Sequence, residues 1–197
     1  MSEPVAMEVM AIVHGQSEYL ICSSIKSNLR LKHEIIARDK GKNSIQITSV
    51  MDVLNDNRFK SFAAFSREFG DVRHKKNKLI DFALFIIMDV DDCTPEQKSW
   101  FISKEMFKAH WLYEYIIPIY NDPNLEATMK AAGIKVEKKE KYILIFPTNH
   151  GDLDMKAAKE FREKLKKSGC SNLCEYLDRC IAIAEKRISL THQRANR

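Results

Sequence analysis

The sequence lacks the long apolar segments and the ordered cysteine patterns that mark membrane, secreted and zinc-binding proteins. No apolar run approaches the ~20 residues that a helix needs to cross a bilayer, and the polar, acidic start at residues 1–4 does not resemble a signal peptide. The five cysteines have neither a paired spacing nor a fourth ligand at a zinc-like interval. We therefore expect a soluble protein of the reducing cytoplasm, with free thiols and no membrane partner.

Internal repeats, low-complexity segments and glycine-rich motifs are missing as well. The chain has six glycines, and Gly15, which follows the first predicted strand, does not amount to the glycine fingerprint of a dinucleotide-binding site. With 45% apolar and 30% charged residues, the composition is that of an ordinary globular protein. A chain of 197 residues is long enough to form one domain with a substantial core.

The sequence does carry a mild excess of positive charge. Its formal net charge of +5 permits contact with a polyanion without requiring it. Basic residues gather in two regions, and such runs also occur on solvated helix faces. The first region holds Lys26, Arg30, Lys32, Arg38, Lys40 and Lys42, and the second holds Arg73, His74, Lys75, Lys76 and Lys78.

Strand-like and helix-like segments alternate along the chain, which predicts an α/β fold. The expected strands are residues 7–13, 44–50, 83–88, 113–120 and 141–146. The expected helices are residues 19–29, 52–69 as one helix or a pair, 94–111, 125–132, 154–167 and 174–188, before a frayed polar tail at 189–197. We expect a mostly parallel central sheet of about four or five strands flanked by helices, within a domain of residues 1–150. Residues 151–197 would form a helical C-terminal extension packed on the same domain.

The clearest functional signal is a buried-strand pattern that ends in acid. The apolar residues 83–88 run directly into Asp89, Asp91 and Asp92. In open α/β sheets, ligands bind at the carboxyl ends of such strands, and two carboxylates at i and i+2 repel each other unless a cation relieves the repulsion. This pattern predicts a Mg²⁺ or Mn²⁺ site. The alternative is that Asp92 or Thr94 merely caps the helix that follows, and both roles can coexist.

Three short motifs occur in order along the chain. Residues 12–18 read Ile-Val-His-Gly-Gln-Ser-Glu, residues 87–91 read Ile-Met-Asp-Val-Asp, and residues 119–126 read Ile-Tyr-Asn-Asp-Pro-Asn-Leu-Glu. The first is similar to a strand-ending VEGxSE motif, the second to a DxD motif and the third to an NP-x-x-E turn. In this order they resemble the Toprim domain, the metal-dependent fold of topoisomerases, primases, and OLD and RloB-like nucleases. The resemblance covers about residues 7–150.

The resemblance implies phosphodiester cleavage by a metal-dependent nuclease. Asp89 and Asp91 would hold one or two Mg²⁺ or Mn²⁺ ions, with Glu18 and Asp92 as further candidate ligands. Asp122 and Glu126 would complete the coordination or orient the ligands from outside. The residues expected to follow a DNA or RNA backbone are Lys26, Arg30, Lys32, Arg73, Lys75, Lys76 and Lys78. Relatives of this type belong to bacterial or phage defence systems, so the resemblance implies a protein partner in a defence complex. Association of identical chains into a homo-oligomer is a further possibility.

The main departure from the family pattern is His14, which stands where the family has a glutamate. Histidine acts as a general acid or base near neutral pH, but it is a poor replacement for a carboxylate toward Mg²⁺. An active site would then use His14, Glu18, Asp89 and Asp91 as its catalytic set. The alternative is a catalytically degenerate Toprim-fold protein that acts as a binding or regulatory module.

Two other DxD chemistries fit less well. A phosphatase of the haloacid dehalogenase type expects a threonine or valine where this chain has Cys93, and it carries the motif on its first strand. Here two earlier strands are expected. A nucleotide-sugar transferase also uses a metal-binding DxD, but no pattern of a sugar site supports it.

Overall fold

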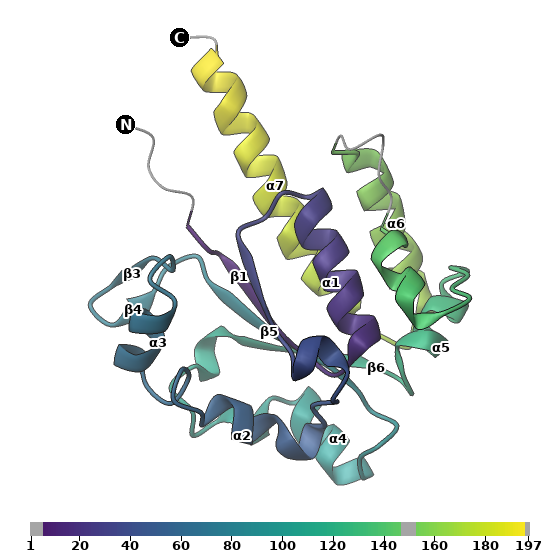
Figure 1. Ribbon diagram of the computed structural model, residues 1–197, viewed down its shortest axis with the longest axis horizontal. Helices are drawn as coiled ribbons and strands as arrows, with labels where there is room; N and C mark the ends of the chain where they lie inside the picture. The colour runs from purple at the N-terminus through teal and green to yellow at the C-terminus, as the bar shows by residue number, and fades with distance from the viewer. Residues whose placement is uncertain (1–5, 147–152, 196–197) are drawn as a thin grey trace.

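The chain folds around a four-stranded parallel sheet with helices on both faces (Figure 1). The computed structural model describes residues 6–146 and 153–195. The strands lie in the order β2 (His33–Ile36), β1 (Val9–Val13), β5 (Ala83–Asp89) and β6 (Ile116–Asn121), and each pair is parallel. The predicted α/β architecture with a mostly parallel sheet is confirmed.

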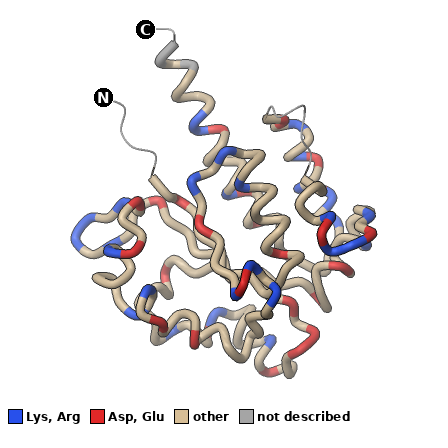
Figure 2. The backbone as a smooth tube through the Cα atoms, viewed as in Figure 1, with Lys and Arg blue, Asp and Glu red and all other residues tan. Residues whose placement is uncertain are grey.

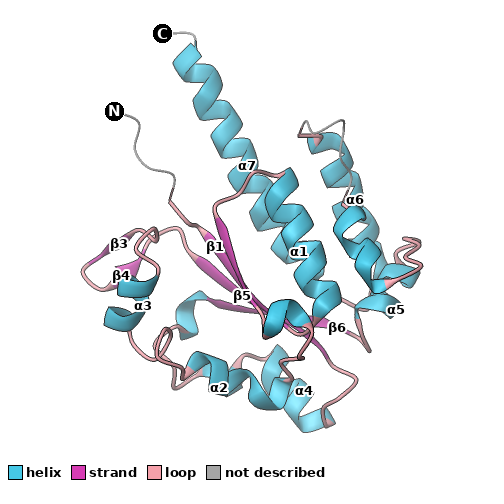
Figure 3. Ribbon diagram, in the orientation of Figure 1, coloured by secondary structure: helices cyan, strands magenta, loops and turns pink. Residues whose placement is uncertain are grey.

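Helices surround the strands in two layers (Figure 3). One layer consists of α1 (Gln16–Asn28), α5 (Leu125–Ala131), α6 (Met155–Ser168) and α7 (Leu173–Ala195). The other consists of α2 (Val50–Leu54), α3 (Phe62–Glu68) and α4 (Pro95–Ile102). The connections contain a small hairpin, β3 (His74–Lys75) with β4 (Lys78–Leu79), and the 3-10 turns η1 (Asp39–Gly41), η2 (Ile47–Ser49), η3 (Glu105–Phe107), η4 (Tyr113–Tyr115) and η5 (Lys139–Leu144).

The two central strands, β1 and β5, are buried along their whole length. Alternate side chains point to opposite faces of a strand, so Val9 and Ala11 enter the core under α1 and α7, whereas Met10 and Ile12 enter the core under α2 and α4. A strand whose side chains pack into a hydrophobic core on each face of the sheet has apolar residues at every position. This is why the continuous apolar runs at residues 7–13 and 83–88 predicted these strands.

Two of the expected strands are wrong, and the sequence predicted neither β2 of the main sheet nor the short β3–β4 hairpin. Residues 44–50 alternate in polarity, but the position beside β1 belongs to β2, and residues 47–54 form η2 and α2 instead. Residues 141–146 lie within η5 and its end, against α1. A fifth strand has no edge to join there, because the Asn172 side chain accepts from the Tyr120 amide at 2.9 Å and donates to the Pro118 carbonyl at 3.0 Å.

Several helix boundaries also differ from the expectation. Helix α1 begins one turn earlier, with Gly15 as its N-cap, and residues 52–69 hold two helices, of which α2 starts at Val50. Helix α4 ends at Ile102, well before residue 111. The expected frayed tail is helical as far as Ala195. Pro118 does lie on an edge strand, as its missing donor predicts.

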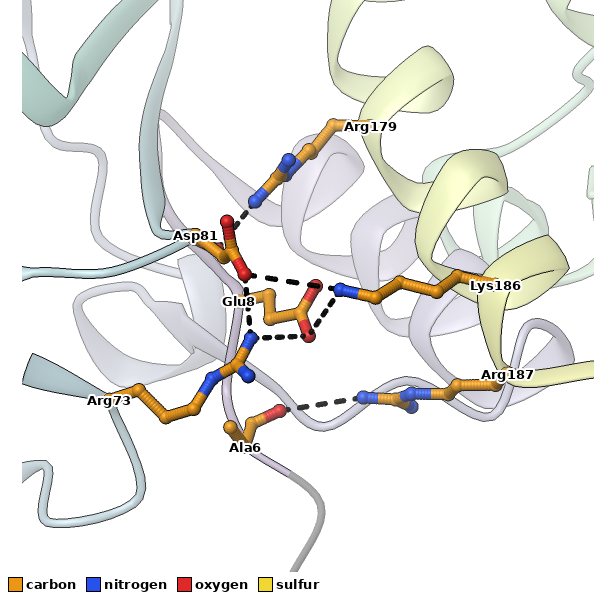
Figure 4. Close-up of polar contacts among 7 residues, drawn as sticks. All are labelled: Ala6, Glu8, Arg73, Asp81, Arg179, Lys186 and Arg187. Carbon is orange, nitrogen blue, oxygen red and sulfur yellow. Dashed lines mark hydrogen bonds and ion pairs between the residues drawn. The ribbon is translucent and has the colours of Figure 1, made fainter. Parts of the chain in front are cut away.

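Near the amino ends of β1 and β5, charged side chains of α7 contact charged side chains of the neighbouring loops (Figure 4). Glu8, just before β1, accepts from Arg73 at 3.3 Å and lies 3.8 Å from Lys186. Arg73 also pairs with Asp81 at 2.9 Å, and Arg179 donates to the Asp81 carbonyl. These contacts hold the last described helix against the first strand and the loop before β5.

Helices α6 and α7 share the core under α1 with the central strands. The predicted boundary at residue 150 lies outside the described residues, so the division into a domain and an extension stays a prediction. Within the described part of the chain, no helix is both long enough and apolar enough to cross a membrane.

Candidate functional site

A polar cavity of about 150 Å³ lies at the carboxyl end of the sheet. Five segments of the sequence meet there: the turn from β1 into α1, the loop around η1, the end of β5, the start of α5, and η5. The charged and titratable side chains that line it are His14, Glu18, Lys42, Asp89, Glu126 and Lys139. Carboxylates and cationic groups therefore face one small space.

Glu18 is the most buried carboxylate of this cavity, with 2% of its surface exposed. It lies in the first turn of α1, where its Oε2 accepts from the Gly15 amide at 3.0 Å. Its other oxygen, Oε1, is buried and accepts no hydrogen bond from the described residues. Burial, followed by the charge of Asp89, raises the pKa of Glu18 to about 8. Glu18 thus has one oriented oxygen and one that is available to a ligand.

Asp89 is the last residue of β5 and is 6% exposed. Its Oδ1 accepts two hydrogen bonds of 3.1 Å, from the Asn121 side chain and from the Leu125 amide at the start of α5. Burial raises the pKa of Asp89 to about 6, although His14 and the bond from Asn121 oppose this shift. Asn121, at the end of β6, had no assigned role in the sequence, because its contact with Asp89 depends on strand pairing.

Glu126 lies in the first turn of α5 and completes a set of three carboxylates, with Glu18 in the first turn of α1 and Asp89 at the end of β5. The Ser17 hydroxyl donates to its Oε1 at 3.1 Å across 109 positions of sequence. Lys139, on η5, lies 3.9 Å from the same oxygen. Glu126 was expected either to complete the coordination or to orient the ligands from outside, and the structure brings it to the wall of the cavity.

His14 follows β1 and continues its pairing with β5, because its amide donates to the Ile87 carbonyl at 2.9 Å. Its Nδ1 lies 3.0 Å from the Ile45 carbonyl oxygen. A carbonyl oxygen only accepts, so Nδ1 is the nitrogen that donates to Ile45, and whenever the ring is neutral Nε2 carries the lone pair. His14 can therefore accept a proton or bind a metal through Nε2.

The structure separates Asp91, Asp92 and Asp122 from this cavity. Strand β5 ends at Asp89, so the i and i+2 spacing no longer places both aspartates on one face. Asp91 is exposed and accepts from the Asn124 side chain at 2.9 Å, and Asn124 in turn caps α5. Asp92 is exposed, and Asp122 pairs with Lys98 at 2.5 Å. Thr94 caps α4, with Pro95 at the first helical position, as the capping alternative predicted.

Most of the basic residues that were expected to follow nucleic acid lie near the amino ends of the strands, whereas Lys42 of the first basic region lines the cavity. Lys26 is in the last turn of α1, and the β3–β4 hairpin with Lys75, Lys76 and Lys78 precedes β5, at the left of Figure 2. Arg30 and Lys32 come just before His33, which pairs with Val9 at the start of β1. Lys32 and Arg73 are already engaged in ion pairs. The lysines that reach the cavity are Lys42 and Lys139.

The cavity suits a hard divalent cation in its chemistry, although the side chains are not closed around one point. In the described residues, no three His, Cys, Asp or Glu side chains stand close enough together to hold a metal as they are. The three carboxylates supply the oxygen ligands that Mg²⁺ and Mn²⁺ prefer. A cation there would also offset the repulsion and burial that raise the pKa of Glu18 and of Asp89.

These features define the fold and the candidate site from geometry alone. The resemblance to Toprim proteins stays a prediction that depends on the three motifs. No family model, no curated protein and no solved structure matches this chain.

Proposed function

We propose that this protein binds Mg²⁺ or Mn²⁺ between Glu18, Asp89 and Glu126 and cleaves phosphodiester bonds of DNA or RNA. The observation that carries the proposal is the buried Oε1 of Glu18, which has no hydrogen-bond donor among the described residues although Asp89 and Glu126 lie close by. An ionised, buried carboxylate with one oxygen that lacks a donor, next to two further carboxylates, is costly unless a cation neutralises it.

The residues around the carboxylates fit defined roles in such a site. A divalent ion would supply charge neutralisation of the phosphate and a lowered pKa for an attacking water. The Gly15 amide orients Glu18, the Asn121 side chain orients Asp89, and the Ser17 hydroxyl orients Glu126.

The cavity also holds groups that would act on the substrate. His14 would accept a proton at Nε2, because its Nδ1 is tied to the Ile45 carbonyl. Lys42 and Lys139 would contact the phosphate oxygens.

The experiment combines metal binding with cleavage. Mn²⁺ binding is measured by titration calorimetry, and cleavage of plasmid DNA and of single-stranded RNA is followed with Mg²⁺, Mn²⁺ or EDTA. We expect Asp89→Asn and Glu18→Gln to abolish both binding and cleavage. Asp92→Asn is the matched control, because it removes an exposed aspartate outside the cavity. Cleavage that persists in Asp89→Asn, or that does not depend on a divalent ion, contradicts the proposal.

A non-catalytic binding or regulatory module is the second candidate, and His14 favours it. The residue at the family's glutamate position is tethered to a backbone carbonyl, and an imidazole is a weak ligand for Mg²⁺. His14→Glu discriminates the two. A gain of metal-dependent cleavage would show that the natural site is degenerate, whereas loss of an existing activity would show that His14 takes part. A p-nitrophenyl phosphate assay tests the phosphatase alternative in the same preparation.

A further inference from the structure

The hydroxyl of Tyr142 is a second buried polar group near the carboxylates that the proposed function leaves unused. Tyr142 is 1% exposed, and its hydroxyl makes no hydrogen bond with any residue of 6–146 or 153–195. Buried hydroxyl groups are normally hydrogen-bonded. A buried tyrosine that served only to fill the core would pack equally well as phenylalanine.

The position of Tyr142 follows from the fold of η5. This turn packs against α1, the helix that carries Glu18, and it also supplies Lys139 to the cavity. Tyr142 and Glu126 together line an adjoining hollow of about 490 Å³. Burial raises the pKa of Tyr142, and the charges of Glu126, Glu18 and Asp89 add to this effect. All three carboxylates are thus within electrostatic reach of one hydroxyl.

The chemistry of the two unpartnered groups is complementary. An ionised carboxylate only accepts hydrogen bonds, and a neutral tyrosine hydroxyl can donate one. Oε1 of Glu18 lacks a donor among the described residues, and the hydroxyl of Tyr142 lacks an acceptor there. The carboxylates are not gathered around one point in this structure, so a cation that draws them together would change their distance to η5.

We propose that Tyr142 is a positioning residue of the metal site, whose hydroxyl donates to Glu126 or Glu18, directly or through one water, when these carboxylates bind a divalent cation. This inference rests on the proposed function. Groups that orient metal ligands in this way usually change metal affinity by about 10- to 100-fold when they are removed.

The test compares Tyr142→Phe with Tyr176→Phe, which is the matched control. Tyr176 is also fully buried, but its hydroxyl lies 3.1 Å from Nε2 of His33, and it does not line the cavity. For each variant, Mn²⁺ affinity is measured by calorimetry and the unfolding midpoint is measured in EDTA. We expect Tyr142→Phe to weaken Mn²⁺ binding at least tenfold while its midpoint stays the same or rises. We expect Tyr176→Phe to lower the midpoint, because His33 loses its partner, and to leave Mn²⁺ affinity unchanged.

The outcomes separate this inference from the proposed function. If the natural protein binds Mn²⁺ and Tyr142→Phe binds it equally well, the role of Tyr142 is refuted and the proposed function stands. If Tyr142→Phe lowers the midpoint as Tyr176→Phe does, the hydroxyl has a structural partner and the inference is again overturned. If the natural protein binds no divalent ion, the proposed function and the role of Tyr142 both fall.

Discussion

Glu18 and Asp89 face the same cavity from the ends of β1 and β5, and the charge of Asp89 adds to burial in raising the pKa of Glu18. The resemblance to the Toprim domain placed Glu18 and Asp89 in one set of residues, but the spacing of the aspartates and the charge runs did not. Their proximity arises because β1 and β5 are parallel neighbours, with Val13 opposite Ile87, so that the residues following one strand end beside the last residues of the other.

The first prediction concerns stability and pH in EDTA. A carboxyl group whose pKa is higher in the folded protein binds its proton more tightly there, so its contribution to stability declines as pH rises. For Glu18 this decline spans the window from about 4.5 to about 8. Glu18→Gln mimics the protonated form. We expect the variant to gain stability over the natural protein across this window, by a few kcal/mol at pH 8–9, in chemical denaturation at several pH values.

The control for this measurement is Glu34→Gln, which removes an exposed carboxylate on β2. The free energy of unfolding of Glu34→Gln should differ from that of the natural protein by much less than the free energy of unfolding of Glu18→Gln does. A Glu18→Gln difference that does not change between pH 5 and 9 would mean that Glu18 is ionised without penalty, contrary to its burial.

The second prediction separates the two aspartates of the DxD motif. Asp89→Asn should reduce metal-dependent cleavage by more than 100-fold, because it removes the negative charge of a proposed metal ligand that lines the cavity. Asp91→Asn should cost less than tenfold, since Asp91 contacts the α5 cap residue Asn124 and not the cavity. Steady-state cleavage rates at saturating Mg²⁺ measure both. Equal losses would show that Asp91 moves into the site on metal binding.

The third prediction concerns the lysines that contact substrate. Losing a charge-assisted hydrogen bond costs about 1.5–3 kcal/mol, or roughly 10- to 100-fold in affinity. Lys139→Ala should therefore raise the KM for a phosphodiester substrate by about tenfold or more. Replacing Lys75, Lys76 and Lys78 together by alanine should leave KM nearly unchanged. The hairpin that carries them precedes β5, whereas the cavity lies at the carboxyl ends of β1 and β5. The opposite ranking would assign nucleic-acid binding to the hairpin.

The fourth prediction concerns Gly41, which packs the η1 loop onto the start of α1. Its φ is +86°, and a Cβ there would lie 2.6 Å from backbone atoms of Gly15 and Gln16. Gly41→Ala should therefore cost about 3 kcal/mol or more in the free energy of unfolding. Gly133→Ala isolates the cost of positive φ, because Gly133 has φ +69° and open space around it. That control should lose only about 1 kcal/mol. Similar losses in both variants would disprove the close approach.

The parts of the fold that the sequence predicted are those with strong local patterns. Strands β1 and β5 are uninterrupted apolar runs, and Thr94-Pro95 and Gly169 mark helix ends by their own conformational preferences. Strand β2 reads His-Glu-Ile-Ile, which is too short and too polar to stand out. Residues 141–146 are rich in β-forming side chains, but the edge they would join is blocked by Asn172.

Only part of the candidate site could be predicted from the sequence, because some of its residues come together through contacts between distant segments. Asp89 was selected because it ends an apolar run, whereas His14, Glu18 and Glu126 were assigned through the motifs that resemble the Toprim domain. Glu126 and Lys139 reach the cavity through contacts between distant segments, such as the Ser17–Glu126 hydrogen bond. The two basic regions were chosen by charge density, and density in the sequence does not tell which end of a βαβ unit a residue occupies.

The packing of α7 affects how the polypeptide folds during translation. Tyr176 of this helix lies against His33 beside one strand edge and against Phe85 of β5, so the sheet lacks part of its cover until α7 has left the ribosome. We expect β1 and β5 to stay partly uncovered in the nascent polypeptide until α7 emerges, and the polypeptide to depend on chaperones during that interval.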